Sequence, residues 1–392
     1  MRGPVAATVL ALLVGCGAPS PSSEGQPAPR SSAAPEAGPE PEPTSELSAD
    51  PERPPRADAP PVRKDGTVYA ESELMGTRVS LNLYVGDPAR AAEAGQAAQA
   101  ALDEMARLEQ ILSEWRADSD LSRLSDAAGG PPVVVVPELF AIVQRSVEIA
   151  EQTDGAFDPT FHGVGQLWSF APGAVPPTRE QVAAKLPLVG WDGLELNPQT
   201  RSIRLRKPGM KLGLGAIGKG FAADEASAVL AERGFPNHVV EVGGDTYAAG
   251  TKDGKPWMVG IQRPDGPGAL GAIAASGLAV VTSGDYQRYF EHEGQRYAHI
   301  LDPRTGGPIP AERSPKSVTL IAGNATDADA YCTAVAVMGV EDGMVFVEAH
   351  EGLDAVIITQ DDQLRVSSGL RDRLVLPPAP PSPPAEAATA TD

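Results

Sequence analysis

The chain has 392 residues, enough for one large or two ordinary domains, and its 32 basic and 52 acidic side chains give a net charge of −20. This acidic balance argues against a nucleic-acid ligand and against electrostatic adhesion to anionic lipid. The two cysteines, Cys16 and Cys332, do not suggest a disulfide framework, and Cys332 lies in an apolar run that predicts a buried free thiol.

The first residues have the pattern of an export signal. Arg2 precedes a short apolar run at residues 5–14, which is too short to span a membrane. The sequence Leu-Val-Gly-Cys at residues 13–16 resembles the bacterial lipobox, in which Cys16 becomes the lipidated first residue. An ordinary secretory signal with a chance cysteine is the alternative. We therefore expect residues 1–15 to be a signal peptide, and the mature chain to be a periplasm-facing lipoprotein of the cell envelope.

Two segments lack the apolar residues that a core requires. Residues 16–66 are rich in Pro, Ala, Ser and Glu and are predicted to be a disordered tether that begins at the lipidated cysteine. Residues 377–392 are predicted to be a second Pro/Ala-rich tail. The folded part is therefore predicted to span residues 67–376.

Within the folded part, short strands are interleaved with a few helices. Val79, Leu81 and Leu83 alternate with polar residues and predict a strand, and helical spacing of apolar residues predicts helices at 88–112 and from Pro137 onward. Later strands are predicted at 194–205, 239–242, 257–261, 279–282, 317–322, 355–359 and 363–366, and helices at 221–233 and 325–338. This mixture favours an α+β fold with mixed or antiparallel sheets over a regular parallel sheet.

A glycine-rich segment, Gly213 to Gly220, directly precedes a predicted helix. Its glycines let backbone amides approach a ligand, and a helix N-terminus favours an anion. The segment partly matches a dinucleotide fingerprint with Glu241 as the ribose contact, but the charged residues at 204–211 do not form a buried parallel strand. It also partly matches a phosphate loop, but no Ser or Thr follows Lys219. Both matches are weak, but both indicate a phosphorylated ligand.

Two further places carry candidate chemistry. His299 lies in a predicted strand that ends at Asp302-Pro303, and it is either part of a polar strand rim or a functional residue. Asp329 and Thr333 are four residues apart on a predicted helix and so share one face. A carboxylate and a hydroxyl there offer the hard oxygen ligands that suit Mg²⁺, although this spacing is also common by chance.

Seven motifs occur in a single order along the chain, and together they resemble the ApbE family of flavin transferases. They are Met75-Gly-Thr, Gly155-Ala-Phe-Asp-Pro-Thr160, Leu214-Gly-Ala-Ile-Gly-Lys-Gly220, Val242-Gly-Gly-Asp245, Ser283-Gly-Asp285, His299-Ile-Leu-Asp-Pro-Arg-Thr-Gly306 and Asp329-x-x-x-Thr333. The resemblance covers nearly the whole folded part and implies an ApbE-like fold. It also implies an FAD:protein FMN transferase, which attaches FMN through a phosphoester to a Thr or Ser of an exported protein and releases AMP.

The resemblance also implies roles for individual residues. Mg²⁺ would be held by the backbone carbonyl of Ala216 and the side chains of Asp329 and Thr333. His299 would be the catalytic base. The FAD site would be lined by Met75, Ala156, Phe157, Asp158 and Lys219. Some members of the family have an acidic residue where Lys219 stands, and Asp302 and Arg304 could equally serve only to fix the turn.

Two other functions remain open at this point. A hydrolase would use the same metal and phosphate groups to pass FMN to water, so the motifs do not separate it from a transferase. A flavin-binding lipoprotein without catalysis would keep the FAD pocket but could lose His299 or the Asp329/Thr333 pair. All three residues are present, which favours an enzyme.

Overall fold

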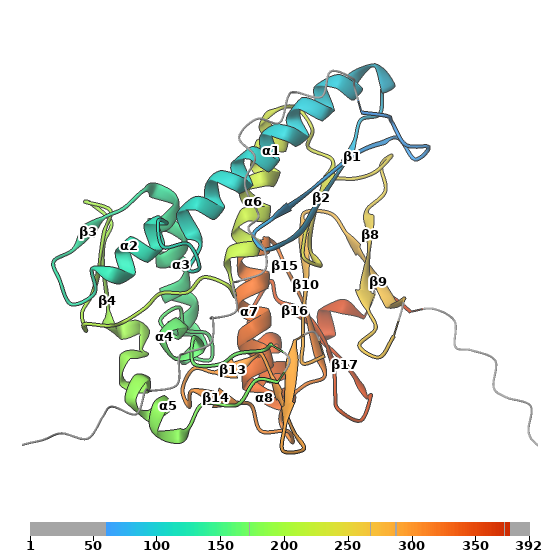
Figure 1. The fold of residues 1–392 in the computed structure, drawn as a ribbon. Coiled ribbons are helices and arrows are strands. Elements are labelled where there is room, and N and C mark those ends of the chain that lie inside the picture. Colours follow the sequence, from blue (N-terminus) through green and yellow to red (C-terminus); the bar gives the residue numbers. More distant parts are fainter. Residues whose placement is uncertain (1–59, 172, 267, 287, 372, 377–392) are drawn as a thin grey trace, which may run out of the picture. The chain divides into compact units, whose positions relative to one another are not determined.

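An eight-stranded antiparallel sheet forms the centre of the computed structural model, which describes residues 60–376 except 172, 267, 287 and 372 (Figure 1). All of these residues belong to one compact unit. In spatial order the strands are β1 (Thr67–Leu74), β2 (Thr77–Tyr84), β6 (His238–Val242), β7 (Asp245–Ala249), β10 (Leu278–Gly284), β15 (Ser317–Ala322), β16 (Asp354–Ile358) and β17 (Leu364–Val366). Cys16, the signal peptide, the tail and nearly all of the tether lie outside the described residues.

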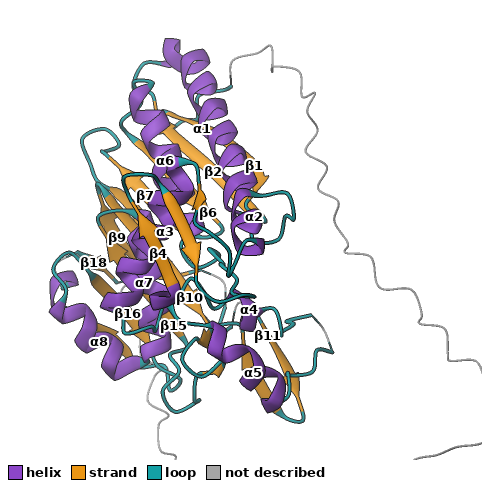
Figure 2. Cartoon of the chain, turned by 90° about the vertical axis from the view of Figure 1, so that its left-hand side faces the viewer, coloured by secondary structure: helices purple, strands orange, loops and turns teal. Residues whose placement is uncertain are grey.

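Helices pack on one face of this sheet, and Figure 2 shows them beside the strands. The alternation of side chains explains this arrangement: Ala279 and Val281 of β10 join the core beneath the helices, whereas Val280 points to the opposite face. The helices are α1 (Ala91–Leu112), α2 (Asp120–Asp126), α3 (Pro137–Gln152), α4 (His162–Gly165), α5 (Arg179–Lys185), α6 (Gly218–Glu232), α7 (Ala325–Met338) and α8 (Val340–Ala349).

A second sheet covers the other face. It consists of β18 (Leu374–Val375), β9 (Ala269–Ala275) and β8 (Trp257–Gln262), and its Ile261 and Ile273 pack against Val280. The remaining strands form three small sheets: β3 (Val133–Val134) with β5 (Ser202–Leu205) and β4 (Leu194–Asn197), the hairpin of β11 (Tyr289–His292) and β12 (Gln295–Ala298), and β13 (Leu301–Asp302) with β14 (Gly307–Pro308).

The predicted α+β class is confirmed, and the sheets are antiparallel at every pairing of the described strands. Cys332 is a buried free thiol, as expected. One local prediction was wrong: α6 begins at Gly218 rather than at 221. Among the described helices, none is both long and apolar enough to cross a membrane.

Candidate functional site

Two buried carboxylates and one lysine meet where α6, α7 and the start of β7 come together. The ammonium of Lys219 lies 2.5 Å from Asp245 Oδ2 and 3.0 Å from Asp329 Oδ1. The amide of Gly220 donates to Asp329 Oδ2 at 3.1 Å. The Lys219 side chain keeps 30% of its exposure, so the cluster opens to solvent on the lysine side. A buried ion group with an exposed end is suited to receive a charged ligand.

The charges of this cluster shift one another's ionisation. Burial disfavours the ammonium of Lys219, but the two carboxylates outweigh burial and raise its pKa above the usual range. Burial raises the pKa of Asp245 to about 6, against the opposing effect of Lys219 and with the help of the Asp329 charge. Lys219 therefore remains a cation and holds two carboxylates that would otherwise repel each other.

Backbone packing explains why α6 and α7 approach so closely. A Cβ atom on Gly220 would lie 2.1 Å from the carbonyl oxygen of Ala325, so only glycine fits at this helix contact. The amide of Gly220 bonds to Asp329 rather than to the carbonyl of Ala216 four residues earlier. Among the described residues, no hydrogen bond reaches that carbonyl, so the Ala216 oxygen is available as a ligand.

The oxygen donors near this corner fit a magnesium ion. Asp329 and Thr333 lie one turn apart on α7, Thr333 is half-buried, and Ala216 contributes a carbonyl just before α6. Carboxylate, hydroxyl and carbonyl oxygens are the hard ligands that Mg²⁺ prefers. The described residues contain no cluster of three or more His, Cys, Asp or Glu side chains for a metal, so a ligand phosphate would have to complete the coordination.

His299 follows β12 and is half-buried. Its Nδ1 lies 3.2 Å from the carbonyl oxygen of Arg288, which can only accept, so Nδ1 carries the proton and Nε2 has a free lone pair. Burial lowers the pKa of His299, and the positive charges of Arg288 and Lys219 lower it further, whereas the hydrogen bond to the carbonyl raises it. The structure therefore holds His299 as a neutral imidazole within the electrostatic reach of Lys219.

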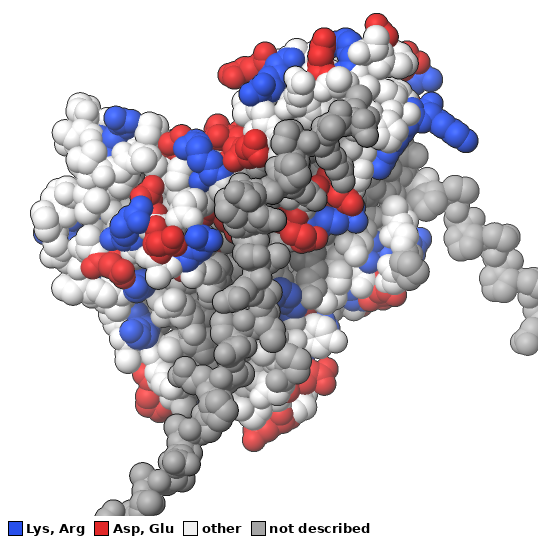
Figure 3. Space-filling view, turned by 45° about the horizontal axis from the view of Figure 1, so that its top comes forward, with Lys and Arg blue, Asp and Glu red and all other residues white. Residues whose placement is uncertain are grey.

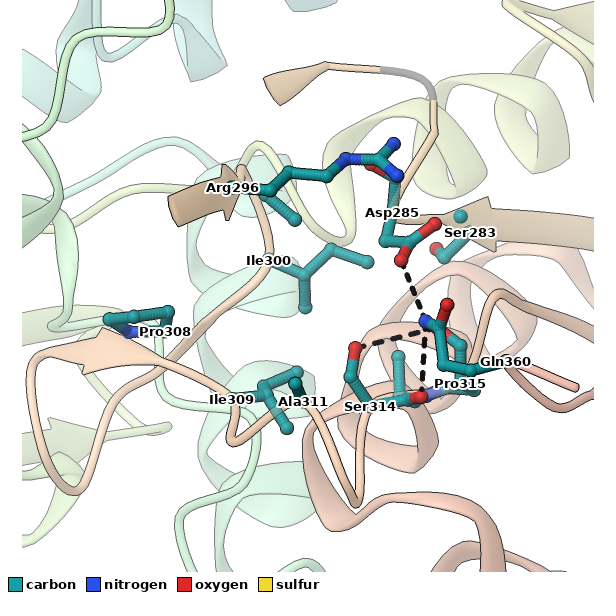
Figure 4. Close-up of a pocket in the computed structure, with 13 residues that line it drawn as sticks. Ser283, Asp285, Arg296, Ile300, Pro308, Ile309, Ala311, Ser314, Pro315 and Gln360 are labelled. Atoms are coloured by element: carbon teal, nitrogen blue, oxygen red, sulfur yellow. Dashed lines mark hydrogen bonds between the residues drawn. The ribbon is translucent and has the colours of Figure 1, made fainter. Parts of the chain in front are cut away.

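A cavity of about 160 Å³ lies between the end of β10, the chain around 296–315 and α7. Figure 4 shows Arg296 and Ile300 on one side of it and Asp285 and Gln360 on another. Gln360 Nε2 donates to Asp285 Oδ2 at 2.8 Å, whereas Asp285 Oδ1 is buried and has no hydrogen-bond partner among the described residues. Ala336 also lines the cavity and continues the α7 face that carries Asp329 and Thr333. The cavity is therefore lined in part by the helix that carries Asp329 and Thr333.

Met75 is brought to the glycine segment by the turn between β1 and β2. Met75 and Gly76 both have positive φ angles, 55° and 69°, which suits a two-residue hairpin turn. The Met75 amide donates to Glu109 Oε2 at 2.8 Å, and the Met75 methyl group lies 4.0 Å from the position of a Cβ on Gly218. The side chain therefore lies against the first turn of α6.

The segment at 156–158 is arranged differently. Ala156 and Phe157 are buried in the main core, so only their backbone could meet a ligand. Asp158 accepts hydrogen bonds from the amide and hydroxyl of Thr160 at 2.8 and 2.6 Å and from the amide of Trp191 at 3.0 Å. In the part of the chain that the structure describes, no hydrogen bond or ion pair joins the side chains of this segment to Lys219 or Asp329. The FAD-lining role of these three residues stays a prediction.

Asp302 and Arg304 fix the turn after His299. Asp302 is buried, and its two carboxylate oxygens accept from Arg304 Nε and Nη2, both at 2.8 Å. The Asp302 carbonyl accepts from the amide of Gly306 at 2.8 Å. A second cavity, of about 200 Å³, lies between this turn and the 154–158 segment. The contacts of Asp302 and Arg304 therefore fit a structural role, in which the two residues fix the turn.

Three residues of the site were missed by the sequence reasoning. The sequence places Asp245 in a motif but predicts no role for it, although a carboxylate after two glycines at a strand end is typical of a functional residue. Glu114 is half-buried, and its partial removal from water raises its pKa; it accepts a hydrogen bond from the amide of Leu214 at 3.2 Å. Trp115 is 78% exposed and meets His162 edge-on, with 5.6 Å between ring centroids. Nothing local in the sequence indicated that Glu114 would hold the glycine segment.

Known proteins resemble this chain in sequence and in fold. The model of the ApbE family matches residues 75–357. A Treponema pallidum protein named FAD:protein FMN transferase is 36% identical, over 78% of this chain and 88% of its own length. An Escherichia coli K12 protein of the same name is 35% identical, over 74% of this chain and 84% of its own. The structure of the ApbE protein from Thermotoga maritima superposes with a TM-score of 0.69 at 32% identity, over 78% and 98% of the two chains. The flavin transferase ApbE from Vibrio cholerae gives 0.69 at 28%, over 78% and 99%.

Proposed function

Because this chain belongs to the ApbE family, we propose that it is an FAD:protein FMN transferase. The hydroxyl oxygen of a Thr or Ser on an acceptor protein attacks the flavin-side phosphorus of FAD. The bond from that phosphorus to the bridging oxygen breaks, AMP leaves with the bridging oxygen, and the hydroxyl proton goes to a base. The observation that carries this proposal is the meeting of Lys219, Asp245 and Asp329 at the head of α6, beside a neutral His299.

The buried corner supplies the charge that a pyrophosphate requires. Asp329, Thr333 and the Ala216 carbonyl would hold a magnesium ion, which stabilises negative charge on the pyrophosphate as AMP leaves. Lys219 is already a cation at this place and lies at the exposed side of the cluster. Its ammonium is therefore placed to offset part of the negative charge of a phosphate. The glycine segment adds backbone amides at the start of α6.

His299 has the protonation state that a general base needs. The Arg288 carbonyl fixes the proton on Nδ1, so Nε2 can accept the proton of the acceptor hydroxyl. A lowered pKa keeps the ring neutral near pH 7. After the transfer, the imidazolium of His299 releases this proton to solvent.

The cavity of Figure 4 suits the adenosine half of FAD. Its apolar wall includes Ile300, Pro308 and Ile309, and the polar residues Asp285 and Gln360 also line it. On this proposal the flavin half lies toward Met75 and the backbone of the 156–158 segment. The exposed ring of Trp115 is a stacking surface near the glycine segment that this half could use.

The acceptor and the location of the protein belong to the same proposal. An exported protein would receive FMN at the outer side of the membrane to which Cys16 anchors the transferase. FAD, the acceptor and the membrane are then its three partners, and nucleic acid is not one of them.

Mass spectrometry of exported proteins co-expressed with this chain tests the proposal. We expect one or more of them to gain a covalent FMN on Thr or Ser. His299→Ala should lower the initial rate of transfer by roughly 10²- to 10⁴-fold, because the hydroxyl loses its base. His292→Ala, on the same hairpin, is the matched control and should leave the rate unchanged. Release of free FMN and AMP with no flavin on any acceptor would show a hydrolase instead.

A further inference from the structure

Aromatic and apolar side chains gather beside His299. Trp168, Phe290 and Leu301 form the buried centre of this group. Around them lie half-buried side chains that we call the aromatic rim, defined as Leu167, Phe170, Ala174 and Tyr297. Tyr297 stacks on Phe290 with 4.9 Å between centroids, and Phe170 meets the His299 ring edge-on at 6.4 Å. The catalytic candidate is therefore part of the edge of a partly exposed apolar surface.

The chain at 296–300 separates this rim from the adenosine cavity. Arg296, Ala298 and Ile300 line the cavity. Tyr297 and His299 lie between them in sequence and contact the rings of Phe290 and Phe170. The side chains of β12 alternate between its two sides, which explains why Arg296 and Ala298 line the cavity while Tyr297 packs on Phe290. The chain bends at His299, whose ring lies against Phe170. His299 thus faces away from the cavity wall that its two neighbours form.

The geometry of phosphoryl transfer relates the two sides of the 296–300 segment to the leaving group and the attacking group. The attacking and leaving oxygens lie roughly in line on opposite sides of the phosphorus. When the AMP half occupies the cavity, the attacking hydroxyl comes from the other side, where the rim lies. Water needs no surface to reach that position, whereas a polypeptide must be held there.

We propose that the aromatic rim is the docking surface for the acceptor polypeptide, an inference that rests on the transferase function proposed above. The occupant is a segment that carries apolar side chains next to its Thr or Ser, since half-exposed aromatic rings bind apolar groups well. Val175 follows the rim residue Ala174 in sequence and is 63% exposed, so a charge can be introduced there without being buried. On this inference, the aromatic rim favours transfer of FMN to a bound polypeptide over transfer to water.

Kinetics with charged variants of Val175 test this inference. The substrate is the unmodified form of the exported protein that gains FMN in the co-expression experiment. Val175→Asp and Val175→Lys should each raise the KM for this acceptor at least fivefold, because either charge is unfavourable against an apolar partner. The kcat, the Kd for FAD and the slow release of FMN to water should stay within twofold of wild type, since Val175 touches neither FAD nor the corner.

Val134→Asp is the matched control, because Val134 is 69% exposed but lies on β3 in another sheet. It should change none of these quantities. The inference is overturned when both Val175 variants keep the wild-type KM, when only one sign of charge has an effect, or when Val134→Asp raises the KM equally. A wild-type protein that labels no exported protein overturns the transferase proposal itself, which keeps the two failures distinct.

Discussion

At the scale of single residues, the state of His299 follows from one carbonyl group. The Arg288 carbonyl accepts the Nδ1 proton, and the backbone amide of His299 donates to the same oxygen at 3.0 Å. These two contacts fix both the ring and its tautomer. Lys219 and Arg288 add positive charge nearby and make a second proton less favourable. A histidine in this setting is a base at neutral pH without a carboxylate partner.

The titration of His299 follows from this setting. Its pKa lies below the ordinary value of about 6.5, so the ring stays neutral, and able to accept a proton, as the pH falls through 6.5. We expect an NMR titration of histidine-labelled protein to place the midpoint of His299 below 6.5. The spectrum of His299→Ala assigns the signal among the five histidines. A midpoint above 6.5 would mean that burial and the two cations do not control the ring.

At the scale of elements, the contact between α6 and α7 builds the corner. Gly220 lets the two helices touch, and the same residue gives its amide to Asp329. Asp329 is thereby oriented by a backbone group as well as by Lys219. The geometry of the proposed metal site therefore depends on how closely two helices can pack.

Substitution of Gly220 tests this dependence. In Gly220→Ala the new methyl group would clash with Ala325 O, so the helices must separate, and the free energy of unfolding should fall by about 1–3 kcal/mol. Binding of Mg²⁺ with FAD should weaken in parallel as Asp329 moves. Gly218→Ala is the control on the same helix, because its Cβ would have no neighbour closer than 3.9 Å. Urea unfolding of both variants measures the difference, and equal stability of the two would contradict the steric argument.

The elements themselves were largely predictable from the sequence. The strong apolar pattern of 325–338 gave the bounds of α7 correctly, and strand alternation placed β2. Contacts between distant residues were not predictable. Gly220 and Asp329 are 109 positions apart, and no local pattern encodes a helix crossing. The placement of 156–158 also depends on packing: Phe157 joins the core and Asp158 ties a loop, which a motif does not reveal.

At the scale of the whole molecule, the large sheet is a scaffold, and residues at the ends of its central strands form the proposed site. β7 and β10 lie in the middle of the sheet, and the residues at their ends, Asp245 and Ser283 to Asp285, face the corner or the cavity. Figure 3 shows acidic and basic side chains interspersed on one face of the molecule. The net negative charge is therefore spread out rather than gathered into one patch on this face, which does not favour binding to an anionic membrane surface.

Membrane attachment is accordingly predicted to depend on Cys16 alone. Cys16→Ser removes the thiol that would carry the lipid, and we expect the protein to move from the membrane fraction to the soluble fraction. The rate of flavin transfer to a soluble acceptor should not change. Cys332→Ala, which alters a buried thiol, should leave the protein in the membrane fraction. Immunoblots of separated fractions measure both, and a Cys16→Ser protein that remains with the membrane would refute the lipid anchor.

The ion pairs of Lys219 bear on whether the protein can fold before it binds a metal ion. Small metal-organised domains stay unfolded until their ion binds, because their ligands cannot be brought together without it. Here the ammonium of Lys219 already balances Asp245 and Asp329 within the chain. The polypeptide can therefore complete its fold before the proposed magnesium ion binds. On the proposed function, folding of the protein does not depend on the supply of that metal.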